Sequence, residues 1–367
     1  MSAPPPIPLF KVFMAPRDAL MPRLESVLYS GQISEGEPVA EFERRFAAFA
    51  GIDHALSFCS GTAALHVAML LAGAGPETEV VSTPITAEPS NLAILHAGAR
   101  VVWADVDPMN GNLDADSVAA CITPRTRAVL VVHYGGIPAP MAAIHRVAQA
   151  AGVPVIEDAA HALGARYGGA PVGVDSDYCM YSLQAIKHLT TVDGGMLACR
   201  READRERGRL LRWFGMDRKA ARLELDVREA GFKYHMNNVN ATIGLVQLEH
   251  VGAAIARHVE NGRWFDQALA GIDGIECCTW DAQAEPAYWF YTVLAERRDA
   301  LERALTARGI GCGTVHRRND LHSVFRDSRR DLPGVDRWSA RTLHLPCGWW
   351  VGDEERERIR DALREGW

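Results

Sequence analysis

Two side chains of opposite charge stand out because each lies in an apolar stretch of sequence. Lys187 lies in YSLQAIKHLTTVDGG, and Asp158 ends the first half of VPVIEDAAHALG. A desolvated lysine has a lowered pKa, and its neutral amine attacks carbonyl carbons. A carboxylate at the end of a buried strand needs a positive partner, because burying an unpaired charge is costly. The alternatives are a surface lysine on a loop and an aspartate that caps the following helix.

A third set of residues has the chemistry to bind an anion. In FCSGTAALH, Gly61 and Thr62 lie where a strand passes into a helix. The free N–H groups and the dipole at a helix N-terminus attract phosphate, and glycine lets the backbone approach it closely. Ser182, five residues before Lys187, could add a hydroxyl. His161, three residues after Asp158, could hydrogen-bond a phenolic oxygen, or it could be an ordinary core histidine.

Pyridoxal phosphate (PLP) offers these residues a carbonyl, a ring nitrogen and a phosphate. We therefore predict that Lys187 carries PLP as a Schiff base. Asp158 would hold the ring nitrogen protonated, which makes the ring an electron sink. The sequence contains neither G-x-G-x-x-G nor a P-loop pattern, so a dinucleotide site finds no support. Its cysteines and histidines show no zinc-site spacing, and we expect no metal.

The elements that must position these residues alternate along the first two-thirds of the chain. Short runs rich in β-branched residues, such as 79–84 and 128–133, are separated by helix-like stretches. This pattern predicts an α/β fold, in which helices cover both faces of a sheet and ligands bind at the carboxyl ends of its strands. We expect an N-terminal arm and a large α/β domain over residues 1–236. A long connecting helix and a smaller α+β domain would follow over residues 237–367.

Composition narrows the functional classes. The chain has 39 basic and 46 acidic residues, a net charge of −7, which argues against a nucleic-acid partner. It has no apolar run of the roughly 18 residues that a membrane span needs. Its beginning lacks the pattern of a signal peptide, and its eight cysteines are scattered like reduced thiols. We therefore expect a cytoplasmic protein.

Four segments in order carry a resemblance to a known family: SGTAALH, IEDAAHALG, YSLQAIKHLTTVDGG and MNNVNATIGLVQLE. The chain resembles, nearly end to end, the DegT/StrS-like sugar aminotransferases, a group of fold type I PLP enzymes. The resemblance implies a mixed, mostly parallel sheet in the large domain and a homodimer with shared active sites. It also implies the site residues: Lys187 and Asp158 in catalysis, with His161, Gly61, Thr62 and Ser182 as further cofactor ligands.

The sequence departs from the family pattern at two places. The family's G-Y-N-Y-R stretch, whose Asn reaches the phosphate of the neighbouring chain, reads GFKYH here. The resemblance therefore implies that Lys233 of the partner subunit completes the phosphate site as a point charge. Ala87 lies where the family usually has an aromatic side chain that stacks on the cofactor ring. The ring is then covered differently or held less tightly.

The implied reaction moves an amino group from an amino acid, glutamate in our expectation, to a keto sugar. The expected acceptor is a nucleotide-linked 3- or 4-keto-6-deoxy sugar. In GCGTVHRRNDLHSVF, His316, Arg317 and His322 would contact it, and an arginine fork suits a diphosphate. The alternatives are an aminotransferase for a keto-cyclitol, a PLP-dependent sugar dehydratase, and a non-catalytic regulatory relative. Dehydratases typically replace the lysine by histidine, and here Lys187 is present but is followed by His188.

Overall fold

The structure, a computed structural model, describes residues 4–218, 220–221 and 223–367. Its centre is a seven-stranded sheet in the order β1-β9-β8-β5-β4-β2-β3. Four neighbouring pairs are parallel, and the two pairs that β9 forms are antiparallel. The strands are β1 (Ala55–Phe58), β2 (Glu79–Ser82), β3 (Arg100–Trp103), β4 (Thr126–Val132), β5 (Val155–Asp158), β8 (Tyr178–Ser182) and β9 (Gly195–Cys199). The predicted α/β fold with a mixed, mostly parallel sheet is confirmed.

Helices cover both faces of the sheet because successive strand residues are apolar on alternate faces. In β2, Val80 belongs to one buried cluster and Val81 to another. In β4, Leu130 joins the first cluster, whereas Val129 and Val131 join the second. The first cluster includes side chains of α3 (Gly61–Leu71), α4 (Glu88–His96) and α7 (Glu202–Leu211), and the second includes side chains of α5 (Ala115–Cys121) and α6 (Met141–Ala151).

The C-terminal part of the chain builds a smaller sheet with its own core. The helical stretch that starts near residue 237 is divided at Glu249 and His250 into α8 (Asn238–Leu248) and α9 (Val251–Ala268). Side chains of α9, the small sheet and the last helices meet in one buried cluster. These elements are β10 (Ile275–Cys277), β12 (Tyr291–Ala295), β13 (Thr342–Leu345), α10 (Arg298–Ala307) and α12 (Asp353–Arg364). The buried side chains of α11 (Pro333–Arg341) belong instead to the first cluster of the large sheet.

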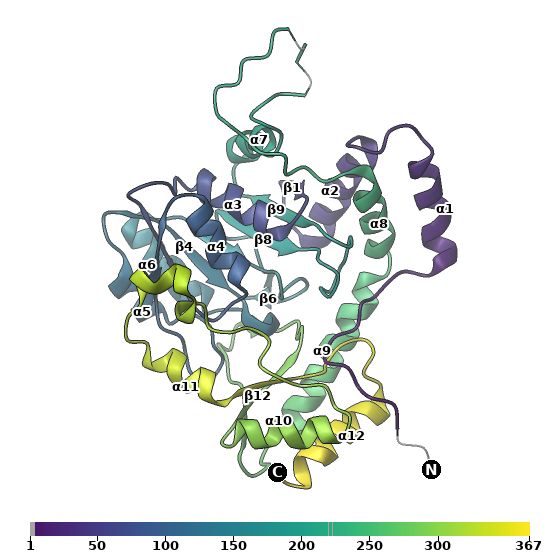
Figure 1. Cartoon of the computed structure of the whole chain (residues 1–367), viewed down its shortest axis with the longest axis vertical. Coiled ribbons are helices and arrows are strands. Elements are labelled where there is room, and N and C mark those ends of the chain that lie inside the picture. The colour runs from purple at the N-terminus through teal and green to yellow at the C-terminus, as the bar shows by residue number, and fades with distance from the viewer. Residues whose placement is uncertain (1–3, 219, 222) are drawn as a thin grey trace.

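The first residues link the two parts of the molecule. Ile7 exchanges backbone hydrogen bonds of 2.8 and 2.7 Å with Gly309 and Gly311. Further along, the N–H of Ala15 donates to Gln247 of α8 at 2.7 Å. Figure 1 shows this arm beside α9 and the last helix, before α1 (Arg17–Leu28) and α2 (Glu37–Ala50) reach α8.

Two features lie outside the main layers. β6 (Arg166–Tyr167), β7 (Ala170–Pro171) and β11 (Ala284–Glu285) form a separate three-stranded sheet in the order β11-β6-β7. The chain after α7 projects away from the body of the molecule (Figure 1). No helix within the described residues has the length and apolar character to cross a membrane.

Candidate active site

A cavity of about 330 Å³ lies at the carboxyl ends of β4, β5 and β8, where the fold type predicts a ligand site. Seven of the residues predicted from sequence line it together: Gly61, Thr62, Asp158, His161, Ser182, Lys187 and His316. Arg317, His322 and Lys233 are not part of this lining. The strand ends and the loops after them therefore bring most of the predicted site to one place.

Lys187 lies on the loop that follows β8. Its Nζ is 3.8 Å from the centroid of the Trp289 ring, and its backbone N–H donates to the carbonyl of Gln184 at 3.0 Å. Burial lowers the pKa of the Lys187 amine to about 7, although the negative charge of Asp158 acts in the opposite direction. A large fraction of the amine is therefore neutral near pH 7, which is the form that attacks a carbonyl.

Asp158 ends β5 and is only 2% exposed. Its Oδ2 accepts a hydrogen bond of 2.6 Å from the hydroxyl of Ser90, and its Oδ1 accepts one of 3.0 Å from the N–H of Ala160. Burial raises the pKa of the Asp158 carboxyl, and these two hydrogen bonds counteract it. Turns rather than a helix follow Asp158, so it is no helix cap. The Asp158 carboxylate lines the cavity and forms no salt bridge with the residues that the structure describes. It is therefore available to accept a hydrogen bond from a protonated ring nitrogen.

The start of α3 forms a cradle for an anion. The Ser60 hydroxyl caps the helix by accepting from the N–H of Ala63 at 3.1 Å. A Cβ on Gly61 would lie 3.0 Å from Met180 Sδ and 3.4 Å from Ser182 Cβ, so a side chain there would crowd the cavity wall. Glycine thus brings the helix N-terminus close to the Ser182 side chain. The N–H groups at the start of α3 and the hydroxyls of Thr62 and Ser182, which line the same cavity, suit the phosphate of PLP.

Two histidines line the same cavity. His161 Nδ1 lies 3.4 Å from the N–H of Gly135 and accepts from it, so in the neutral ring Nε2 carries the proton. Burial and the nearby charge of Lys187 hold the pKa of His161 well below its usual range. The Nε2 of His316 is buried without a hydrogen-bond partner among the described residues, and burial lowers the pKa of this ring to about 4. His161 can therefore donate to an oxygen, and His316 has an unused polar atom for a ligand.

The remaining predicted residues lie outside the cavity wall. Arg317 is exposed next to His316, and His322 Nε2 lies 3.3 Å from Glu88, which begins α4. Lys233 is exposed and pairs through its backbone with Trp213. These positions leave Arg317 and Lys233 free to meet a larger ligand or a second chain, and they do not place them in this chain's cavity.

Two residues of the site were missed in the sequence. Ser90, which orients Asp158, lies within the segment that follows β2, three residues after Ala87. Trp289, which contacts Lys187, lies in a run of aromatic residues that reads as a strand. A serine and a tryptophan carry no spacing signal, and only the contact across the fold identifies them.

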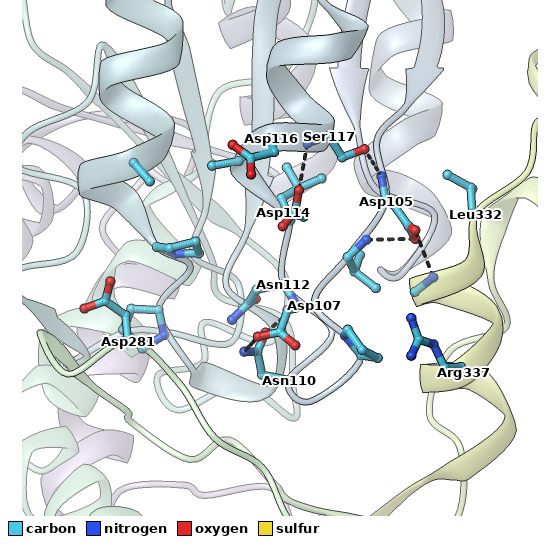
Figure 2. Close-up of a pocket in the computed structure, with 18 of the residues that line it drawn as sticks. Asp105, Asp107, Asn110, Asn112, Asp114, Asp116, Ser117, Asp281, Leu332 and Arg337 are labelled. Carbon is cyan, nitrogen blue, oxygen red and sulfur yellow. Dashed lines mark hydrogen bonds between the residues drawn. The ribbon is translucent and has the colours of Figure 1, made fainter.

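A second hollow, of about 700 Å³, lies beside α5 and α11 and is called the acidic hollow here, because Asp105, Asp107, Asp114, Asp116 and Asp281 line it (Figure 2). Asp105 accepts from the N–H groups of Gly334 and Val335 at 2.8 and 2.9 Å and so caps α11. Asp114 caps α5 by accepting from the N–H of Ser117 at 2.7 Å. No cluster suited to a metal ion is found among the residues described.

Comparisons with known proteins give one consistent result. The model of the DegT/DnrJ/EryC1/StrS aminotransferase family matches residues 16–364. The spore coat polysaccharide biosynthesis protein SpsC of Bacillus subtilis is 32% identical over 356 residues, which are 92% of each chain. The crystal structure of the sugar aminotransferase CalS13 from Micromonospora echinospora superposes with a TM-score of 0.95 at 40% identity, over 98% of this chain and 100% of that one. The crystal structure of AtS13 from Actinomadura melliaura gives 0.96 at 40% identity over 100% of both chains.

Proposed function

The chain belongs to the DegT/DnrJ/EryC1/StrS aminotransferase family, and we propose that it transfers the amino group of glutamate to a nucleotide-linked 3- or 4-keto-6-deoxy sugar. Its enzyme class is that of the PLP-dependent sugar aminotransferases. The observation that carries the site assignment is the convergence of Lys187, Asp158 and the N-terminus of α3 on one cavity. The amine, the carboxylate and the anion cradle match the carbonyl, the ring nitrogen and the phosphate of PLP.

PLP, when bound, supplies an electron sink that lets a hydrogen leave the amino-acid α-carbon as a proton. We assign the attachment of the cofactor to Lys187, because a large fraction of its amine is neutral near pH 7. Once displaced by the donor's amino group, the same Nζ would accept the α-carbon proton and return it at the cofactor's C4′. Asp158, oriented by Ser90 and by the N–H of Ala160, would hold the ring nitrogen.

The other predicted residues would bind and orient the ligands. Gly61, Thr62 and Ser182 would hold the phosphate at the start of α3, and the Nε2 proton of His161 would face the phenolic oxygen. His316 would meet the sugar, because its buried Nε2 has no partner among the described residues. We assign Arg317 and His322 to the outer part of the same substrate, where an arginine fork suits a diphosphate.

The assembly and the location are part of the same proposal. Lys233 would complete the phosphate site of the partner subunit in a homodimer. The exposed apolar side chains of Leu223 and Val227, on the projecting chain after α7, support a contact with a second copy there. The free thiols of all eight cysteines support the cytoplasm as the site of action.

The alternative of a sugar dehydratase finds less support in the geometry. Lys187 faces the cavity, whereas its neighbour His188 does not line it. The His188 ring packs edge-on against His258, with 4.6 Å between centroids. This arrangement supports Lys187, the lysine that transamination uses, as the reacting side chain.

The test is a pair of half-reactions with purified protein and added PLP. Glutamate should change the visible absorbance of the bound cofactor and release 2-oxoglutarate. A panel of keto-sugar nucleotides and keto-cyclitols then identifies the acceptor by mass spectrometry of the amine product. Release of a deoxygenated sugar without 2-oxoglutarate would overturn the transamination proposal, and amination of cyclitols alone would overturn the proposed acceptor.

A further inference from the structure

Trp289 contacts the Lys187 loop in two ways that the roles above leave unused. Its ring centroid lies 3.8 Å from Lys187 Nζ, and its Nε1–H donates to the carbonyl of Ile186 at 2.9 Å. We propose that Trp289 is a positioning residue, which holds the amine of Lys187 and the loop that carries it against the wall of the cavity. The inference deepens the proposed function, since it rests on the assignment of Lys187 as the attachment residue.

The indole is itself held from several sides. It stacks on His161 with 3.8 Å between centroids and 16° between planes, and on Phe10 with 4.6 Å and 28°. Its backbone N–H donates to the carbonyl of Gly135 at 2.9 Å. Trp289 is 2% exposed, so these contacts leave the ring little room to rotate. Because the indole ring is fixed, its contact with Lys187 restricts the conformations of the flexible lysine side chain.

The backbone that delivers Trp289 is strained. Tyr288, immediately before it, has φ of 48°, which is unusual for a bulky residue. The Tyr288 hydroxyl donates to Asp266 at 2.6 Å, and a Cβ on Gly262 would lie 2.2 Å from the tyrosine ring. Strained positions of this kind persist where the surrounding contacts over-determine them, and they concentrate at functional sites.

The contact suits a lysine that is bound and released in each reaction cycle. A freed amine on a long side chain has many rotamers, and holding it near its target removes much of that entropy cost. The face of an indole attracts the charged amine, and the hydrogen bond to Ile186 limits the movement of the loop. Among the described residues, Trp289 is the one Phe, Tyr or Trp that lines the cavity. Trp289 is therefore the aromatic side chain that can position the Lys187 amine.

Several other groups also act on the Lys187 amine, and none of them is substituted in the test. Asp158 at the end of β5 favours its charged form. His161, His188 and His316 interact with it electrostatically, and Asp193 lines the same cavity. A change that follows substitution of Trp289 alone is then due to the indole itself or to His161, which stacks on it.

The experiment measures capture of PLP by the apoprotein, a property separate from turnover. Stopped-flow absorbance gives the capture rate against pH for wild type, Trp289→Phe, Trp289→Leu and the control Trp338→Phe. Trp338 is 1% exposed and lies outside the cavity lining, so its substitution matches the loss of buried ring area. Borohydride reduction and peptide mass spectrometry establish that the captured lysine is Lys187, and thermal melting compares stability.

We expect Trp289→Leu to slow capture roughly tenfold and to lower the midpoint of its pH profile by about half a unit or more, since the charged amine loses its aromatic face. Trp289→Phe keeps a ring but loses the N–H donor, so it should slow capture a few-fold with little change in midpoint. Trp338→Phe should leave rate and midpoint unchanged.

Two results would overturn the role of Trp289: an unchanged rate and midpoint in Trp289→Leu, or a raised midpoint, which would mean that the indole only excludes water. A wild-type apoprotein that does not capture PLP at Lys187 would instead overturn the proposed function itself.

Discussion

The cavity around Lys187 and the acidic hollow beside α11 differ in what their polar side chains are already bound to. The acidic hollow is the larger of the two, at about 700 Å³ against 330 Å³, and it has more carboxylates. The carboxylate oxygens of Asp105 and Asp114 nevertheless already accept hydrogen bonds from the N-termini of α11 and α5. In the cavity, by contrast, burial shifts the pKa values of Lys187 and Asp158, and His316 Nε2 is left unpaired among the described residues.

The comparison shows how to separate structure from chemistry in this molecule. Carboxylates that cap helices are already paired with backbone N–H groups, so the number of such carboxylates in a hollow does not indicate a ligand site. Polar groups held in an unfavourable state are costly, and they are retained where a ligand or a reaction relieves that state. Substitutions in the two hollows should therefore have opposite consequences for activity and stability.

The largest effect is expected at the amine. Replacing Lys187 by Ala removes both the attachment point and the proton carrier, so transamination should fall by at least about 10⁴-fold. The measure is 2-oxoglutarate formed from glutamate, with circular dichroism to confirm the fold. Retained turnover would show that another group carries the chemistry.

A smaller loss is expected at the carboxylate. Asp158→Asn keeps the shape and can still accept from Ser90, but it supplies no negative charge for a protonated ring nitrogen. Activity should fall by roughly 10²- to 10³-fold, while PLP still attaches at Lys187. Absorbance spectra and steady-state rates test this together. An Asn variant with wild-type rates would remove Asp158 from the mechanism.

The pH dependence of PLP capture sharpens the comparison further. Only the neutral amine attacks, so the rate rises with pH until the amine is deprotonated. With a pKa of about 7, capture should rise about tenfold between pH 6 and pH 8 and then flatten. An ordinary lysine would give about a hundredfold rise over the same interval and no plateau. Stopped-flow measurements on the apoprotein distinguish the two profiles.

The smallest effect on activity is expected in the acidic hollow. Asp105→Ala leaves the N–H groups of Gly334 and Val335 at the start of α11 without their acceptor. The free energy of unfolding should fall by about 1–2 kcal/mol, while transamination stays within twofold of wild type. Denaturant titration and a rate assay suffice. A substantial loss of activity with unchanged stability would mean that the acidic hollow takes part in the reaction.

The features that could be predicted from the sequence are those that depend on neighbouring residues. Short runs rich in β-branched residues predicted the sheet. Asp158 and Lys187 were singled out because strand ends and the loops after them can be recognised along the sequence. The start of α3 was predictable for the same reason, since Ser60, Gly61 and Thr62 are consecutive.

Contacts between segments that are distant in the sequence could not be predicted in this way. The bond from Ser90 to Asp158 joins residues 68 positions apart, and the bond from Trp289 to Ile186 spans 103. Adjacent residues also diverge in the fold: His316 lines the cavity, whereas Arg317 beside it is exposed. Which way a side chain points depends on backbone turns that the composition of a loop does not reveal.

The arm at the start of the chain has a consequence for biosynthesis. Ile7 pairs with Gly309 and Gly311, and Phe10 stacks on Trp289, so these contacts can form only after the segment 289–311 has left the ribosome. Contacts of such long sequence separation form late, because the intervening chain must be present and closed into a loop first. The nascent large sheet can assemble earlier, but the wall behind Lys187 is completed only once the segment that carries Trp289 has been synthesised. Stable cofactor loading should accordingly follow synthesis of the segment 289–311.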